Sequence, residues 1–258
     1  MELHYLSATE ALKKFKNKTL SPVELTKAII ERAEKINPKI NAHNFTFYEK
    51  AIDTAKKSEQ KFLFNQNILP LEGIPTAIKD EEDILGQPNT NGSLILKNHI
   101  ATKTMVDVER IVNSGAVIHT RTTTPEFSTT SFTHSKLWGV TRNAWNLDFT
   151  PGGSSGGSGA SLAAGCSTLA TGSDIGGSIR IPASACGLVG FKPPYGRNPQ
   201  EAPFNHDQYC VVGPMARSVQ DCALMQNVMS GPHKKDITSL KPKLTIPEKF
   251  ENIKNWKI

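Results

Sequence analysis

Two amphipathic segments with clear start signals open the chain. Ser7 is followed three residues later by Glu10, which is the pattern of a capping box at the start of a helix. Ser21 precedes Pro22, and a capping serine followed by proline at the first helical position is a stronger start signal. Apolar residues then recur at helical spacing until Pro38, which we expect to end the second helix.

Helical and strand patterns alternate farther along the chain. Thr46 begins a third amphipathic stretch that we expect to be helical as far as residue 62. Residues 69–79 have the pattern of a turn followed by a short strand that ends on a lysine, and residues 116–122 are a β-prone run. This order of helix and strand predicts an α/β fold with helices layered on a sheet.

Two later helices carry recognisable end signals. Thr104 is a candidate cap for a helix that ends near residue 113, where Gly115 follows as a stop. Ser218 is a candidate cap for a helix over residues 219–230.

We predict two parts in the chain. Residues 1–62 form a helical segment that packs on the outside of a core made by residues 63–258. The final letters, NIKNWKI, resemble the beginning of another strand, so we expect the core to be C-terminally incomplete.

Composition narrows the class of protein. Hydrophobic residues make up 38% of the chain and charged residues 21%, as in ordinary globular proteins. No apolar run approaches the roughly 18 residues of a membrane span, and the N-terminus lacks the pattern of a secretory signal, so we expect a cytoplasmic protein. The net charge of +6 lies on lysine-rich ends, without the interleaved aromatic residues that stack on bases, so neither nucleic acid nor a membrane is expected as a partner.

The four cysteines do not have the spacing of a metal site. They form no CxxC pair and have no neighbouring histidine. We expect all four to be reduced and structural, and a catalytic role for Cys210 is the weaker alternative. The cysteines are Cys166, Cys186, Cys210 and Cys222.

Residues 151–192 are dominated by glycine, serine and alanine. Their glycine clusters alternate with apolar pieces that need burial, so a flexible linker does not explain them. Such a density of small residues indicates backbone packed closely against backbone or against a ligand. The letters GGSSG also fit the nucleophile elbow of α/β-hydrolases, but the preceding NAWNLDFTP is not a buried strand, and no GK[ST] follows to make a phosphate-binding loop.

Several motifs in this run and around it belong together. The letters GGSSGGSG at 152–159 and GSDIGGSIRIPASACGLVGFKP at 172–193 closely resemble the amidase signature. GIPTAIKDEED resembles the family's lysine segment, and VVGPMARSVQD resembles its downstream segment. WGVTRNAWNLDFTPGG resembles the approach to the signature, with Ala144 where proline is usual. The resemblance implies the amidase signature fold, an α/β/α sandwich around a mixed sheet.

The resemblance also implies catalytic residues, position by position. It implies Ser178 as nucleophile, Ser154 as a proton relay with a cis peptide bond before it, and Lys79 as general base. Ser155 is expected to support the relay. The implied oxyanion hole consists of the main-chain amides of Ile175, Gly176, Gly177 and Ser178. No metal and no cofactor are implied.

These residue types suit the hydrolysis of an amide. The carbonyl is a poor electrophile, so the attacking serine hydroxyl must lose its proton to a base. A lysine serves as that base only in its uncharged form, which burial favours. Water then hydrolyses the acyl group on Ser178, giving an acid and ammonia or an amine.

Other functions stay open on the sequence. The chain could be an amidotransferase A-type subunit that releases ammonia from glutamine, although the letters GRNPQEAPFNHDQYCVVGPMARSV look more like the broad-specificity amidases. It could also be a truncated, inactive binding module. We expect a small-molecule amide as substrate, and a homodimer is left open.

Overall fold

A six-stranded mixed sheet forms the centre of the molecule. The computed structural model describes residues 2–202 and 204–247. The strand order is β1-β3-β2-β6-β8-β7, and a two-stranded sheet of β4 and β5 lies apart from it. The strands are β1 (His43–Thr46), β2 (Pro75–Lys79), β3 (Val117–Thr122), β4 (His134–Ser135), β5 (Gly139–Val140), β6 (Leu169–Asp174), β7 (Val189–Gly190) and β8 (Val211–Ala216).

The middle of the sheet is parallel and its margins are antiparallel. β2 pairs in parallel with both β3 and β6. β1 pairs antiparallel with β3, and β8 pairs antiparallel with β6 and β7. Every residue of β2, β6 and β8 is buried, as expected of strands covered on both faces.

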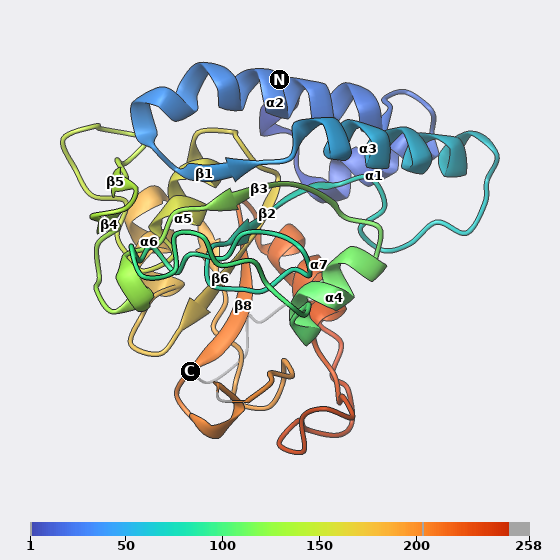
Figure 1. Cartoon of the computed structure of the whole chain (residues 1–258). Helices are drawn as coiled ribbons and strands as arrows, with labels where there is room; N and C mark the ends of the chain where they lie inside the picture. The colour runs from blue at the N-terminus through green and yellow to red at the C-terminus, as the bar shows by residue number, and fades with distance from the viewer. Residues whose placement is uncertain (1, 203, 248–258) are drawn as a thin grey trace, which may run out of the picture.

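Helices cover both sides of these strands. Figure 1 shows α5 and α6 on one side of β6 and β8, α4 and α7 on the other, and α1, α2 and α3 across the end near β1. The helices are α1 (Ala8–Lys16), α2 (Pro22–Ile40), α3 (Tyr48–Leu63), α4 (Val106–Asn113), α5 (Gly156–Ala163), α6 (Arg180–Cys186) and α7 (Val219–Met229). Short 3₁₀ turns occur at Leu3–Tyr5, Glu126–Ser128 and Phe204–His206. The predicted α/β fold with a mixed sheet is confirmed.

The predicted starts of the first two helices, at Ser7 and Ser21, were correct. Both Ser7 and Ser21 accept a hydrogen bond from the third helical residue, and both capping boxes are complete. The predicted stop at Pro38 is wrong, because α2 continues to Ile40 and ends at Asn41 in the left-handed conformation. Pro38 lies in the last turn, so the backbone hydrogen bond that it cannot donate is lost near the end of the helix, which continues for only two more residues.

Two predicted helix starts were wrong because the capping residue has another role. Thr46 lies in β1, where it pairs with Thr120, and α3 begins only at Tyr48. Thr104 accepts a hydrogen bond from the N–H of Leu85, and α4 begins two residues later. The segment 1–62 therefore contributes a strand to the sheet in addition to its helices.

Other predicted elements agree with the structure. The strands expected within 69–79 and 116–122 are β2 and β3. Ser218 caps α7, which ends one residue earlier than expected, and Gly231 follows with a φ of 107°. The strand expected at NIKNWKI lies outside the described residues.

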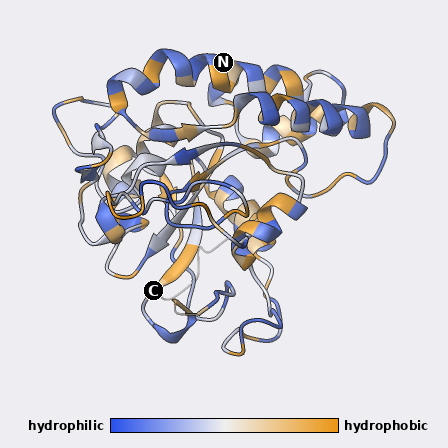
Figure 2. Cartoon of the chain, viewed as in Figure 1, coloured by the Kyte–Doolittle hydropathy of each residue, from blue (hydrophilic) through white to orange (hydrophobic). Residues whose placement is uncertain are grey.

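Burial follows the amphipathic pattern. Figure 2 shows hydrophilic residues along the outer faces of α2 and α3 and hydrophobic residues along β8. All four cysteines are free, and three are buried. Within residues 2–202 and 204–247, no helix combines the length and the apolar character needed to cross a membrane.

Candidate active site

Lys79 is the last residue of β2, and its side chain is fully buried. Its backbone N–H donates to the Thr171 hydroxyl on β6 at 3.0 Å, which ties the strand end to its neighbour. The amine donates to the hydroxyls of Ser154 and Ser173, each at 2.8 Å. It also forms an ion pair with Glu81 at 2.7 Å. The side chain thus lies in the protein interior, bonded to the predicted relay serine.

Ser154 lies in the turn before α5, and the peptide bond between Gly153 and Ser154 is cis. Its side chain is buried, and its carbonyl accepts a hydrogen bond from the Thr124 hydroxyl at 3.2 Å. Glycine is required beside it, because a Cβ on Gly153 would lie 2.7 Å from the backbone of Phe132. The dense glycine pattern therefore serves close backbone packing, as the sequence indicated.

Ser178 lies in the turn between β6 and α6 and is half-buried. Its carbonyl accepts a hydrogen bond from the N–H of Ser155 at 3.2 Å, so the two glycine-rich turns are joined through their backbones. The Ser178 hydroxyl forms no hydrogen bond with the other residues that the structure describes, and this includes Ser154. The structure thus brings Lys79 and Ser154 into direct contact and Ser178 into the adjoining turn.

Ser155 holds the site together through the backbone. Its hydroxyl donates to the carbonyl of Ser173 at 3.4 Å and accepts from the N–H of the same residue at 3.3 Å. It therefore supports the strand that carries Ser173 and makes no hydrogen bond to the Ser154 hydroxyl in the described structure.

Asp174 organises the turn that carries Ser178. Its buried carboxylate accepts hydrogen bonds from the N–H groups of Gly177 at 2.7 Å and Ile179 at 3.1 Å. The Arg180 side chain donates to both carboxylate oxygens at 2.9 Å, and its backbone N–H donates at 3.2 Å. Burial alone would raise the pKa of Asp174, but these donors lower it to about 2. The carboxylate is therefore charged and fixes the shape of the turn.

The main-chain amides predicted for the oxyanion hole differ in their availability. The N–H of Gly177 is engaged by Asp174. Those of Ile175, Gly176 and Ser178 make no hydrogen bond to other described residues, and the first two residues are exposed. At Gly177 the φ is 124°, and a Cβ would lie 2.7 Å from Ile181, so this position requires glycine. Free donors therefore line the exposed side of the turn.

Sequence reasoning missed three residues of this site: Glu81, Ser173 and Asp174. The alternation of side chains along β6 could have revealed Ser173, because Thr171 and Ser173 point to the same face and both contact Lys79. No sequence signal singles out Glu81 among the four acidic residues that follow Lys79. Its contact depends on how the loop after β2 turns back.

A second group of buried charges lies behind that loop. The Arg121 guanidinium donates to the carbonyls of Lys79, at 3.0 Å, and of Glu82. The carboxylate oxygens of Glu82 and Asp107 are buried and have no hydrogen-bond partner in the described structure. Burial raises the pKa of Asp107 to about 7 and that of Glu82 well above its usual range. These groups support the loop but do not reach the serines.

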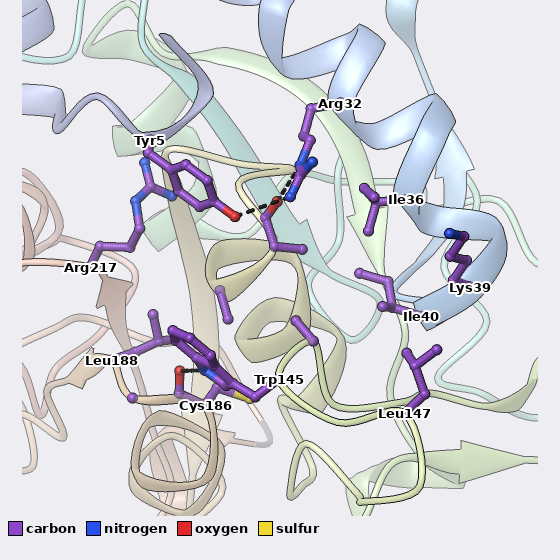
Figure 3. A pocket seen from close by; sticks show the side chains of 14 residues that line it. Tyr5, Arg32, Ile36, Lys39, Ile40, Trp145, Leu147, Cys186, Leu188 and Arg217 are labelled. Atoms are coloured by element: carbon purple, nitrogen blue, oxygen red, sulfur yellow. Dashed lines mark hydrogen bonds between the residues drawn. The ribbon is translucent and has the colours of Figure 1, made fainter. Parts of the chain in front are cut away.

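A cavity of about 440 Å³ lies elsewhere, between α2, α5 and α6 (Figure 3). Arg32 on its wall is bonded within the protein and donates to the carbonyl of Ala164 at 2.8 Å and to the Tyr5 hydroxyl at 3.1 Å. Trp145 on its wall donates to the carbonyl of Cys186 at 2.8 Å. Lys79, Ser154 and Ser178 do not line it, so this cavity is separate from the candidate active site. In the described ranges no group of three or more His, Cys, Asp or Glu residues could hold a metal ion.

The fold and the site together define a class: mixed α/β proteins with a buried lysine bonded to a serine in one glycine-rich turn and a second serine in the adjoining turn. The model of the Amidase family matches residues 24–258. The chain therefore belongs to the amidase signature family, as its motifs indicated.

Individual relatives agree with this assignment. The chain is 43% identical over 243 residues to the A-type subunit of the glutamyl-tRNA(Gln) amidotransferase of Carboxydothermus hydrogenoformans, covering 93% of this chain and 50% of that protein. It is similar in structure to a bacterial aryl acylamidase (TM-score 0.90, 33% identity, 95% of this chain and 51% of that one). It is also similar to a fatty acid amide hydrolase (TM-score 0.88, 31% identity, 95% and 45%). The predicted amidase signature fold is confirmed, and the chain spans about half the length of these relatives.

Proposed function

We propose that this protein hydrolyses carboxylic amide bonds through an acyl ester on Ser178. The observation that supports this most strongly is the buried amine of Lys79, 2.8 Å from the Ser154 hydroxyl, in the turn that bonds to the Ser178 backbone. A buried amine in contact with a hydroxyl, and free N–H groups beside a second hydroxyl, are the parts that acyl transfer requires.

The proposed reaction proceeds in two halves. Ser178 Oγ attacks the amide carbon; its proton passes to Ser154 Oγ, whose own proton passes to Lys79 Nζ. The oxyanion that forms is stabilised by main-chain N–H groups at 175–178, of which the Gly177 N–H must be shared with Asp174. The amide C–N bond then breaks, and the proton returns through Ser154 to the leaving nitrogen. Water hydrolyses the ester by the same relay.

The proposed transfer requires the Ser178 hydroxyl to come within hydrogen-bond distance of Ser154 when substrate binds. Catalytic hydrogen bonds are often long or unformed without substrate and tighten when it binds. The amides meanwhile stay in place because Asp174 fixes the turn.

The proposal is tested with a fluorophosphonate, which labels activated serines. We expect the label on Ser178 in the wild-type chain, none in Ser178→Ala, and strongly reduced labelling in Lys79→Ala and Ser154→Ala. Ser184→Ala is the matched control, because this serine lies exposed on α6, six residues from Ser178. The chain is assayed alone and joined to the part of the Carboxydothermus hydrogenoformans relative that it does not match. Folded chains of both kinds that take up no label would point to a binding module instead.

A second candidate is an amidotransferase A-type subunit that releases ammonia from glutamine. It is favoured by the identity of 43% to the corresponding subunit of a glutamyl-tRNA(Gln) amidotransferase. The two functions are separated by measuring ammonia released from glutamine and from simple aliphatic and aryl amides, without any added protein. Release from simple amides supports a free-standing amidase. Release from glutamine alone, and only with partner proteins and tRNA added, supports the amidotransferase.

A further inference from the structure

The amine of Lys79 has three hydrogen-bond partners, and one of them is a carboxylate. Ser154 and Ser173 each lie at 2.8 Å, and Glu81 Oε2 lies at 2.7 Å. The Ser173 hydroxyl in turn donates to Glu81 at 2.6 Å. Lys79, Ser173 and Glu81 therefore form a closed triangle, and Ser154 lies outside it.

This arrangement suits both protonation states of the amine. A charged amine donates three hydrogen bonds, one to each partner. An uncharged amine keeps two N–H groups for Ser173 and Glu81 and turns its lone pair toward Ser154. The triangle thus aims the lone pair at the hydroxyl whose proton must be accepted.

Glu81 differs from Lys79 in its access to solvent. The amine is 0% exposed, whereas the Glu81 side chain is 11% exposed. Glu81 lies on the wall of a hollow of about 220 Å³, which Asp83 and Asn89 also line. It is therefore the point at which the buried hydrogen-bonded chain meets the surface.

We propose that Glu81 is a positioning residue that, together with Ser173, holds the Lys79 amine on Ser154. This inference rests on the proposed function.

The other titratable groups near the pair make no hydrogen bond or ion pair with the amine in the described structure. Burial raises the pKa of Cys210, which faces the pair from the segment before β8, to about 11. Burial likewise raises the pKa of Asp107 to about 7 and that of Glu82 well above its usual range. Arg121, on β3, donates to the Lys79 carbonyl and not to a group bonded to the amine.

Two further charges near the site are held by partners of their own. The Asp80 carboxylate accepts hydrogen bonds from Asn44 and from the Thr90 backbone and hydroxyl. Asp174 is bonded to Arg180. Glu81 is the carboxylate that contacts the amine directly.

Two substitutions separate charge from position. Glu81→Gln keeps an acceptor for the amine but removes the charge, whereas Glu81→Ala removes both. We expect Glu81→Gln to keep maximal kcat within about tenfold of wild type, because the amide oxygen still accepts a hydrogen bond from the amine. We expect Glu81→Ala to lose about a hundredfold in maximal kcat, because the amine is no longer aimed. Asp83→Asn is the control; its carboxylate bonds to Asn89 on the same loop.

A second measurement does not depend on turnover. Burial would raise the pKa of Glu81, but the Lys79 ion pair and hydrogen bonds with Ser173 and Ser128 lower it. NMR titration of the Glu81 carboxyl should therefore show its pKa rising above the ordinary value in Lys79→Ala.

The outcomes distinguish the two proposals. An active wild type whose maximal kcat is unchanged in Glu81→Ala, or falls as far in Glu81→Gln or in Asp83→Asn, would overturn the role of Glu81. An unchanged Glu81 titration in Lys79→Ala would overturn the ion pair itself. No amide hydrolysis by the wild-type protein would overturn the proposed function, and the titration would still decide whether the two charges interact.

Discussion

Two buried acidic sites lie near the candidate active site, and they are built in opposite ways. Asp174 accepts hydrogen bonds from three main-chain N–H groups and from the Arg180 side chain. Asp107 and Glu82 are also buried, but their carboxylate oxygens have no hydrogen-bond partner among the described residues. The pKa of Asp174 is lowered to about 2, whereas burial raises that of Asp107 to about 7.

The difference shows that burial alone does not decide the charge of a carboxyl group. Donors directed at Asp174 more than offset the cost of removing it from water, so it stays ionised and holds the Ser178 turn. At Asp107 burial outweighs the nearby backbone N–H groups, so its ionised form is costly and folding favours the protonated acid. The charge of Asp174 fixes the turn that carries Ser178, whereas Asp107 avoids a buried charge behind the loop that follows β2.

The largest effect is expected from removing the charge that shapes the turn. Asp174→Ala leaves the N–H groups of Gly177 and Ile179 without their acceptor, so the turn should lose its shape. We expect kcat to fall by about 10²-fold or more, the scale of losing an oxyanion-hole donor, and the free energy of unfolding to fall by about 3 kcal/mol. Steady-state kinetics and urea unfolding measure both. Asp148→Ala, in an exposed loop, should change neither. An unchanged kcat in folded Asp174→Ala would contradict the claim that the charge of Asp174 holds the Ser178 turn.

Removing the titratable carboxyl group of Asp107 is expected to stabilise the folded protein. A raised pKa means that the folded state binds the proton more tightly, so stability present at low pH is lost as pH rises toward and through 7. Asp107→Asn has no proton to lose. Its Tm should exceed that of wild type increasingly between about pH 4 and pH 7 and by a constant amount at higher pH, where the gain in free energy of unfolding reaches about 1–3 kcal/mol. Asp148→Asn is the control, and a difference that does not grow between pH 4 and pH 7 would contradict the account.

The smallest effect is expected from removing some of the hydrogen bonds to Asp174 while keeping its charge. Arg180→Gln takes away the guanidinium donors but leaves the main-chain N–H groups on Asp174. Because a lowered pKa gives stability that is lost as pH falls through the folded value, the acid unfolding midpoint should move to higher pH in this variant. At neutral pH we expect a cost of about 1 kcal/mol. Circular dichroism during acid titration measures the shift, and an unchanged midpoint would show that the amides suffice.

Much of the architecture could be predicted from local sequence signals. The capping boxes at Ser7 and Ser21, the strand that ends at Lys79 and the cap at Ser218 all depend on residues near in sequence. The predicted helix starts at Thr46 and Thr104 were wrong because each residue interacts with a segment distant in sequence. Thr46 pairs with β3, and the Thr104 hydroxyl accepts a hydrogen bond from the Leu85 backbone.

The same rule applies to the candidate site. Family motifs indicated Lys79, Ser154 and Ser178, because each lies inside a recognisable run of letters. The partnership of Lys79 with Glu81 and Ser173 needs the loop after β2 to fold back on β6, which no local pattern encodes. The catalytic roles themselves stay predictions until they are measured.

The most direct test of the account is to find which atom carries the acyl group during turnover. The protein is mixed with an aryl amide, quenched within the first turnover, digested and analysed by mass spectrometry. We expect the acyl mass on the peptide that contains Ser178, formed much more slowly in Lys79→Ala and Ser154→Ala. An acyl group on Ser154, or undiminished hydrolysis by a folded Ser178→Ala, would contradict the mechanism.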